Sequence, residues 1–118
     1  EPKDVASIER TASYDGVYHV LLGALSPLDC IVPRELRLDR FIKRASTGKI
    51  KEVIFATNPN AEGDATALYL IEALKPYEHI KITRIARGVP LGTQIEYIDQ
   101  ATLQSALEGR TTANEGTP

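Results

Sequence analysis

Several features that mark common classes of protein are missing from this sequence. It has one cysteine, Cys30, which can form neither an internal disulfide nor a cysteine-based zinc site alone. No run of about 18 apolar residues marks a membrane span, and no basic segment leads into an apolar one as in a signal peptide. The formal net charge is −2, so any contact with nucleic acid must come from a local patch. These absences favour a protein of the reducing cytoplasm with no membrane partner.

The rest of the composition is that of an ordinary globular domain. Hydrophobic residues make up 42% of the 118 residues and charged residues 25%, enough to build one compact core. We expect one domain over residues 1–110 and a disordered tail over 111–118. The sequence opens at Glu1 with neither an initiator methionine nor an apolar strand before it. We therefore expect a piece of a longer protein in which the first strand of the domain is cut short.

Short apolar runs alternate with amphipathic segments along the chain. Strands are expected at residues 17–22, 53–57 and 80–85, and helices at 4–10, 39–47, 61–75 and 99–108. The unbroken apolar run 53–57 predicts a parallel strand covered on both faces. Helices alternating with such strands predict an α/β fold, a three-layer sandwich around a central, mainly parallel sheet.

Finer features of these elements are also predicted. Asp4, Asp39 and either Asp99 or Thr102 are expected to cap helices, and Gly109 to follow the last one at the C′ position. Within 61–75 a stripe of apolar residues has helical spacing: Ala65, Leu68, Ile71 and Leu74, with Ala67 and Leu70 beside it.

The segment 57–64 joins the end of a predicted strand to the start of the longest predicted helix, where ligands bind in open α/β sheets. Its oxygen donors are Asn58, Asn60, Glu62 and Asp64. Helix capping by Asn60 and acidic residues in the first turn explain much of this pattern. They do not explain Gly63, since glycine inside a helix costs about 1 kcal/mol relative to alanine. Gly63 predicts either a tight packing contact or a close approach by another backbone. These residues alone leave a binding site and simple capping equally open.

Basic residues gather in two other places. Residues 34–51 hold seven basic and two acidic side chains, and Arg40, Lys43 and Arg44 share one helix face, which is either a solvated surface or a phosphate-binding patch. Arg84 and Arg87 flank the end of the last strand, where we expect them near Asn58 and Glu62, and they are further candidates for binding nucleic acid. Phe41 lies among these groups but is expected to face inward, and no other aromatic residue interleaves with them, so base stacking is not predicted.

The two histidines give no zinc signature. His19 lies in the predicted strand 17–22, and we expect a buried core histidine there.

The segment 57–64 resembles the second motif of the Toprim family. Catalytic members carry Asp-x-Asp there, followed by an acidic residue and glycine, and a glutamate at the end of the first strand, which Glu1 matches. In those members the aspartates hold magnesium and the glutamate is the general acid and base. Here Asn58 and Asn60 replace both aspartates. The resemblance therefore implies a non-catalytic site, at most weakly able to bind Mg²⁺, because that ion favours carboxylates.

Further stretches are similar to the RecR family within the Toprim proteins, and together they extend the resemblance over residues 1–110. They are Thr57-Asn58-Pro59, Tyr18–Leu21 with Gly23–Asp29, Thr66-Ala67 with Tyr69, Thr83–Gly92, Glu96-Tyr97 and Ala106–Arg110. Departures from the family pattern occur at Cys30, Val32 and Thr93-Gln94, and they put two loop conformations in doubt.

The RecR resemblance implies a DNA repair and recombination mediator that acts with RecO and RecF to load recombinase on gapped DNA. The full-length family forms a ring-like homo-oligomer that clamps DNA, and it carries a helix-hairpin-helix and a zinc-finger element before this domain. Zinc is expected only there, and no cofactor is expected in this chain. The implied partner-binding residues are Glu1, Asn58, Asn60, Glu62, Gly63 and Asp64. Two alternatives stay open: a metal-dependent Toprim nuclease or primase-like enzyme, and an oligomerisation scaffold.

Overall fold

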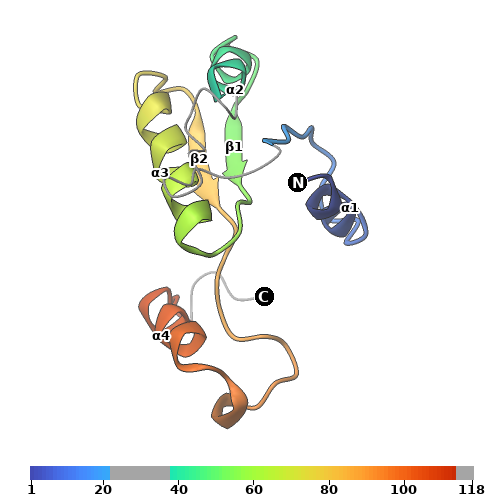
Figure 1. Ribbon diagram of the computed structural model, residues 1–118, viewed down its shortest axis with the longest axis vertical. Helices are drawn as coiled ribbons and strands as arrows, with labels where there is room; N and C mark the ends of the chain where they lie inside the picture. The colour runs from blue at the N-terminus through green and yellow to red at the C-terminus, as the bar shows by residue number, and fades with distance from the viewer. Residues whose placement is uncertain (22–37, 114–118) are drawn as a thin grey trace. The chain divides into compact units, whose positions relative to one another are not determined.

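The computed structural model describes residues 1–21 and 38–113 (Figure 1). The helices are α1 (Pro2–Glu9), α2 (Leu38–Ala45), α3 (Ala61–Leu74) and α4 (Gln100–Glu108), the strands are β1 (Glu52–Phe55) and β2 (Lys81–Arg84), and Ile95–Tyr97 forms the 3₁₀ helix η2. The chain divides into two compact units, Glu1–Arg84 and Ile85–Pro118, which are treated separately below. No helix within the described ranges has the length and apolar character needed to cross a membrane.

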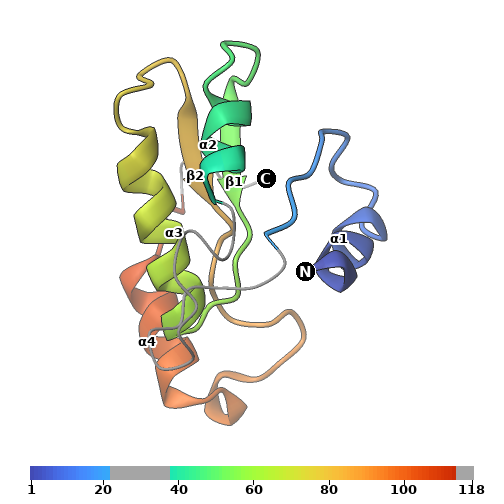
Figure 2. The ribbon, with the colours of Figure 1, turned by 45° about the horizontal axis from the view of Figure 1, so that its top comes forward.

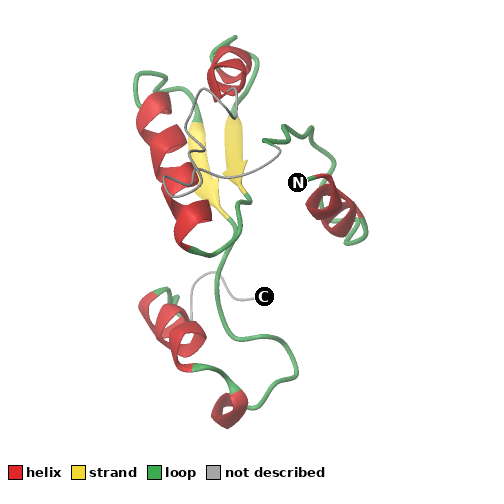
Figure 3. Ribbon diagram, viewed as in Figure 1, coloured by secondary structure: helices red, strands yellow, loops and turns green. Residues whose placement is uncertain are grey.

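The sheet of the first unit consists of β1 and β2, which pair in parallel from Glu52 opposite Lys81 to Phe55 opposite Arg84. Parallel neighbours need a crossover connection, and α3 supplies it (Figure 3). The helix runs alongside β2 in both views of the ribbon (Figure 2). The predicted α/β class with a parallel sheet is confirmed.

The core of this unit combines side chains from α2, the sheet and α3. Its buried members are Leu38, Ala45, Phe55, Ala67, Leu70, Leu74 and Ile80. The rings of Phe41 and Phe55 lie 6.2 Å apart between centroids and join α2 to β1. Val53 packs against the same core, whereas Ile54 points to the opposite face of the strand and is 44% exposed. The prediction that this strand is covered on both faces is therefore wrong at Ile54.

Helix α3 begins and ends as expected, but it buries a different stripe. Its buried residues are Gly63, Thr66, Ala67, Leu70 and Leu74, whereas Leu68 is 57% exposed and Ala65 is exposed. Both stripes have helical spacing, so the periodicity of this apolar helix does not choose between them. The buried stripe includes Thr66, whose hydroxyl is satisfied by donating to the carbonyl of Glu62 at 2.8 Å.

The expected strand at 17–22 does not form in its described part. Residues 17–21 are irregular, and Val17 is 65% exposed. Side chains engage this segment instead: Arg44 donates to the carbonyl of Tyr18 at 2.9 Å, and the Tyr18 hydroxyl donates to Glu9. Some predicted features lie outside the described ranges. They are Leu22, the expected loop 23–33 with Cys30 and Val32, residues 34–37 of the basic stretch, and the tail residues 114–118.

Two helices begin earlier than predicted. Helix α1 starts at Pro2, a residue suited to the first helical position, and the Asp4 amide donates to the carbonyl of Glu1 at 3.0 Å. Asp4 therefore lies inside the helix and Glu1 is its N-cap. In α2, Leu38 is already helical, so Asp39 lies inside the helix and not at its cap.

In the second unit, η2 precedes α4, and Asp99 caps α4 as predicted. The Asp99 carboxylate accepts from the backbone amide of Thr102 at 3.0 Å and from its hydroxyl at 2.6 Å. These bonds, the hydroxyl bond foremost, lower the pKa of Asp99 below its usual range. Gly109 follows the helix as expected, but its φ of −93° is not left-handed, so the predicted C′ role is wrong.

Candidate functional site

The loop between β1 and α3 is folded tightly against the start of the helix. The Asn60 amide donates to the carbonyl of Asn58 at 2.9 Å, which turns the chain into the helix. A Cβ atom added at Gly63 would lie 1.9 Å from that same carbonyl oxygen. The close backbone approach predicted from Gly63 is therefore confirmed, because no other residue fits this contact without a shift of the backbone.

Asn60 serves the helix with both of its oxygens. Its side-chain Oδ1 accepts from the Gly63 amide at 2.8 Å, and its carbonyl accepts from the Asp64 amide at 2.8 Å. The residue is extended, with φ −133° and ψ 176°, as is usual at an N-cap. The amide oxygen that stands in place of a Toprim carboxylate is thus engaged in capping α3.

Asp64 is engaged by a residue twenty positions further along the chain. Nη2 of Arg84, at the end of β2, donates to Oδ1 of Asp64 at 2.7 Å. The two side chains are 36% and 37% exposed, so the pair contributes at most about 1 kcal/mol to stability. The structure thus brings Arg84 to the segment 58–64, as the sequence suggested. Arg87 belongs to the second unit, and its expected approach to Asn58 and Glu62 stays a prediction.

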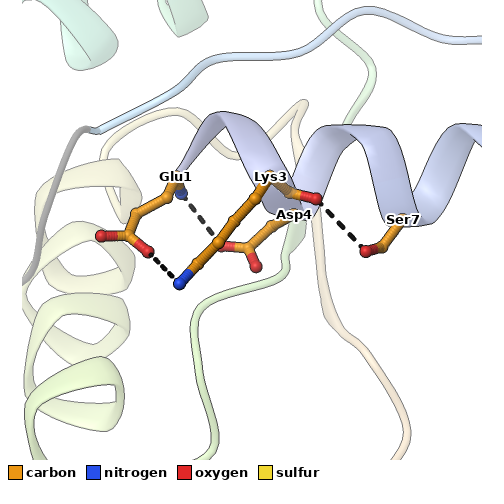
Figure 4. A network of polar contacts seen from close by, with 4 residues as sticks. All are labelled: Glu1, Lys3, Asp4 and Ser7. Carbon is orange, nitrogen blue, oxygen red and sulfur yellow. Dashed lines mark hydrogen bonds and ion pairs between the residues drawn. The ribbon is translucent and has the colours of Figure 1, made fainter.

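Glu1 lies in a local network of its own at the start of α1 (Figure 4). Its Oε2 lies 3.2 Å from Nζ of Lys3, and its backbone nitrogen donates to Oδ2 of Asp4 at 3.0 Å. The network extends to Ser7, whose hydroxyl donates to the carbonyl of Lys3 at 3.2 Å. Within the described ranges, no hydrogen bond or ion pair joins Glu1 to the segment 58–64. That Glu1 belongs to the same site as the segment 58–64 stays a prediction.

The basic face of α2 is only partly available. Arg40 and Lys43 are exposed, but Arg44 is directed at the segment before it in the chain. Its Nη1 donates to the Tyr18 carbonyl and lies 3.4 Å from Nδ1 of His19. All three residues are exposed, and Arg44 differs from Arg40 and Lys43 in its bond to the Tyr18 carbonyl.

His19 is not the buried core residue that was expected. It is exposed, because the strand that would have buried it does not form, and its ring packs edge-on against Phe41 with centroids 5.3 Å apart. Partial burial of the ring lowers the pKa of His19, and the nearby Arg44 charge lowers it further.

One polar pair was not anticipated from the sequence. The hydrogen bond from Tyr18 to Glu9 raises the pKa of Tyr18 to about 12. Glu9 lies in the predicted helix 4–10 and Tyr18 nine positions later in the predicted strand 17–22, and no local signal links them.

The side chains of the segment 58–64 do not fit the magnesium site of catalytic Toprim proteins. Mg²⁺ favours carboxylate oxygens in octahedral geometry, and Asn58 and Asn60 offer neutral amides. Asn60 is engaged as the cap, and Asp64 holds the guanidinium of Arg84. Across residues 1–21 and 38–113, no group of three or more His, Cys, Asp or Glu side chains is placed to hold a metal ion. The arrangement instead offers a surface of exposed amides and carboxylates, including Asn58, Asn60 and Glu62.

Comparison with known proteins gives consistent matches. The family model of the Toprim domain matches residues 1–86, and the model described as RecR, C-terminal matches residues 88–111. Proteins named Recombination protein RecR from Koribacter versatilis, Geotalea uraniireducens and Citrifermentans bemidjiense are 54%, 50% and 49% identical over 110 residues. Each match covers 93% of this chain and 55% of the relative, so the chain spans about half the length of these curated relatives.

Proposed function

The chain belongs to the Toprim family and to its RecR branch, and from this premise we propose that it is a non-catalytic Toprim module of a DNA recombination and repair mediator. Recombination is the process named for its relatives. The family match and the altered motif of this chain support the non-catalytic role together. The whole mediator acts on gapped DNA, and this domain contributes a docking surface to it.

The observation that carries the proposal is the use made of the motif at 58–64. Oδ1 of Asn60 accepts a hydrogen bond from the Gly63 backbone amide, and Asp64 is paired with Arg84. A site that activates water or a phosphodiester needs carboxylates arranged around a divalent ion. The segment has amides at both of the motif's aspartate positions, and its Asp64 is paired with Arg84. What remains is the start of a well-capped helix.

RecO and RecF are the proposed partners, with DNA bound mainly by the full-length homo-oligomer. Asn58, Asn60 and Glu62 are exposed and offer hydrogen-bonding groups to a partner's backbone or basic side chains. Arg40 and Lys43 are exposed on α2 and suit phosphate contacts. Variants of these two surfaces can therefore test partner binding and DNA binding separately.

The first experiment is a calorimetric titration of the chain with Mg²⁺ and Mn²⁺. We expect millimolar or weaker binding, and tighter binding by the Asn58→Asp/Asn60→Asp variant, since two carboxylates return to the motif. Micromolar binding by the natural sequence would reopen the metal-dependent enzyme. So would nicking of plasmid DNA with Mn²⁺ that Glu1→Gln abolishes.

The second experiment separates docking from scaffolding. Binding of RecO and of a gapped duplex is measured for Arg40→Glu/Lys43→Glu and for Asn58→Ala/Glu62→Gln, with Lys75→Glu as a control on the far end of α3. We expect the α2 variant to weaken DNA binding and the motif variant to weaken RecO binding. Unchanged binding in both would favour a scaffold role.

A further inference from the structure

The position of Arg84 has a consequence for the metal chemistry of the motif. We propose that Arg84 supplies a permanent positive charge to the segment 58–64. Its guanidinium pairs with Asp64 and repels a divalent ion there, independently of the two amides. This inference rests on the proposed non-catalytic function and names a residue that maintains it.

The sheet register places Arg84 at the site. Phe55 and Arg84 are paired at the ends of the two parallel strands, so the loop that leaves β1 and the last residue of β2 share the carboxyl edge of the sheet. Helix α3 begins at that edge, directly after the loop. A long side chain at the end of β2 therefore reaches the first turn of α3, where Asp64 lies.

The contact itself is short and charge-assisted. The distance of 2.7 Å from Nη2 of Arg84 to Oδ1 of Asp64 lies at the short end for a guanidinium and a carboxylate. A guanidinium stays protonated at every physiological pH, so the pairing does not relax by loss of a proton. The carboxylate that follows Gly63 is thus held by a permanent positive charge.

A divalent ion at the motif would meet that charge at close range. It would have to displace Arg84 from Asp64, or bind beside it. At a separation of about 6 Å, even with the dielectric constant of bulk water, repulsion between a unit charge and a divalent ion weakens binding about tenfold. Restoring carboxylates at positions 58 and 60 leaves this repulsion in place. The amides and Arg84 are therefore two separate barriers to metal binding.

The test measures Mn²⁺ affinity in the restored background by calorimetry. The variants are Asn58→Asp/Asn60→Asp alone, with Arg84→Gln, with Arg84→Lys and with Arg40→Gln. Arg40→Gln removes the same charge from an exposed position on α2, and Arg84→Lys keeps the charge at the site. Asn60→Asp retains an N-cap residue, so α3 stays capped.

We expect Arg84→Gln to tighten Mn²⁺ binding about tenfold, and Arg40→Gln and Arg84→Lys to change it less than about twofold. Equal effects of Arg84→Gln and Arg40→Gln would overturn the inference, because only the overall charge would then matter. Thermal melts by circular dichroism check folding, and Arg84→Met replaces the glutamine variant if that variant melts early. Micromolar binding by the natural chain would instead overturn the proposed function, so the two failures are distinguishable.

Discussion

All the buried hydrophobic residues of the described chain lie in the unit Glu1–Arg84, and the described residues of the second unit include none. The second unit exposes large apolar side chains instead, with Leu91 103%, Tyr97 74%, Ile95 65% and Leu107 59% exposed. Both units contain helices with apolar positions, but only α2 and α3 bury theirs. Within its own unit α4 has no fully buried side chain, and the Asp99 cap is a local bond that stabilises its start.

Removing a core side chain from α3 gives the largest expected contrast between the units. Leu70 is 1% exposed, and Leu70→Ala should lower the free energy of unfolding by about 3 kcal/mol. The same truncation in α4, Leu107→Ala, should change it by less than about 0.5 kcal/mol, because Leu107 is 59% exposed. Urea denaturation measures both. Similar losses would show that Leu107 is buried against a surface of this chain or of a second copy.

The contact at Gly63 gives the next effect. Gly63→Ala should cost about 2 kcal/mol, because the new methyl group overlaps the Asn58 carbonyl and the helix start must shift. Gly88, at the start of the second unit, has open space around its Cβ position and no positive φ, so Gly88→Ala is the matched control. Full stability of Gly63→Ala would contradict the geometry of the loop.

The two helix caps compare the units directly. Asn60→Ala should cost about 1 kcal/mol, and Asn60→Asp should restore most of the loss, since aspartate is an equally good N-cap. Asp99→Ala should reduce the helix content of α4 in NMR chemical shifts and leave the first unit unchanged. A fall in helicity of α3 after Asp99→Ala would mean that the units are coupled.

The smallest effect is a dependence of stability on pH in the first unit. The pKa of His19 in the folded chain lies below its ordinary 6.5, so the unfolded chain binds the proton more readily. Stability should fall as the pH drops from 6.5 toward the folded pKa, because the imidazolium is partly buried and faces Arg44. Denaturation midpoints of the natural chain and His19→Gln measure this. A slope that persists in His19→Gln would assign it to another group.

Local chemistry allowed part of the fold to be predicted. Asn60 and Asp99 act as caps and Gly63 is in contact with a backbone, because each of these depends on neighbours in the chain. The parallel pairing of β1 with β2 was predicted from the alternation of helices with apolar strands. The strand expected at 17–22 depended on a pairing partner, and side-chain bonds from Arg44 engage its carbonyl instead. The buried stripe of α3 was missed because an apolar helix offers several stripes of equal spacing.

The site was predicted in its residues and less well in its geometry. The sequence places the motif residues together because they lie close to one another in the segment 58–64. They are Asn58, Asn60, Glu62, Gly63 and Asp64. The pairing of Arg84 with Asp64 required the strand register, which fixes where β2 ends relative to α3. Glu1 was assigned to the site by resemblance alone, and in the structure its contacts are with Lys3 and Asp4.

Gly63 also bears on how such motifs are used to diagnose enzymes. The space at this residue is closed by the Asn58 carbonyl, whatever side chains occupy positions 58 and 60. The path of the backbone therefore requires glycine at position 63. This glycine is present although positions 58 and 60 carry asparagine. In an unfamiliar protein, an acidic residue followed by glycine at this turn identifies the loop. Metal-dependent catalysis would be indicated only by carboxylates before the glycine that are not paired with a cation such as Arg84.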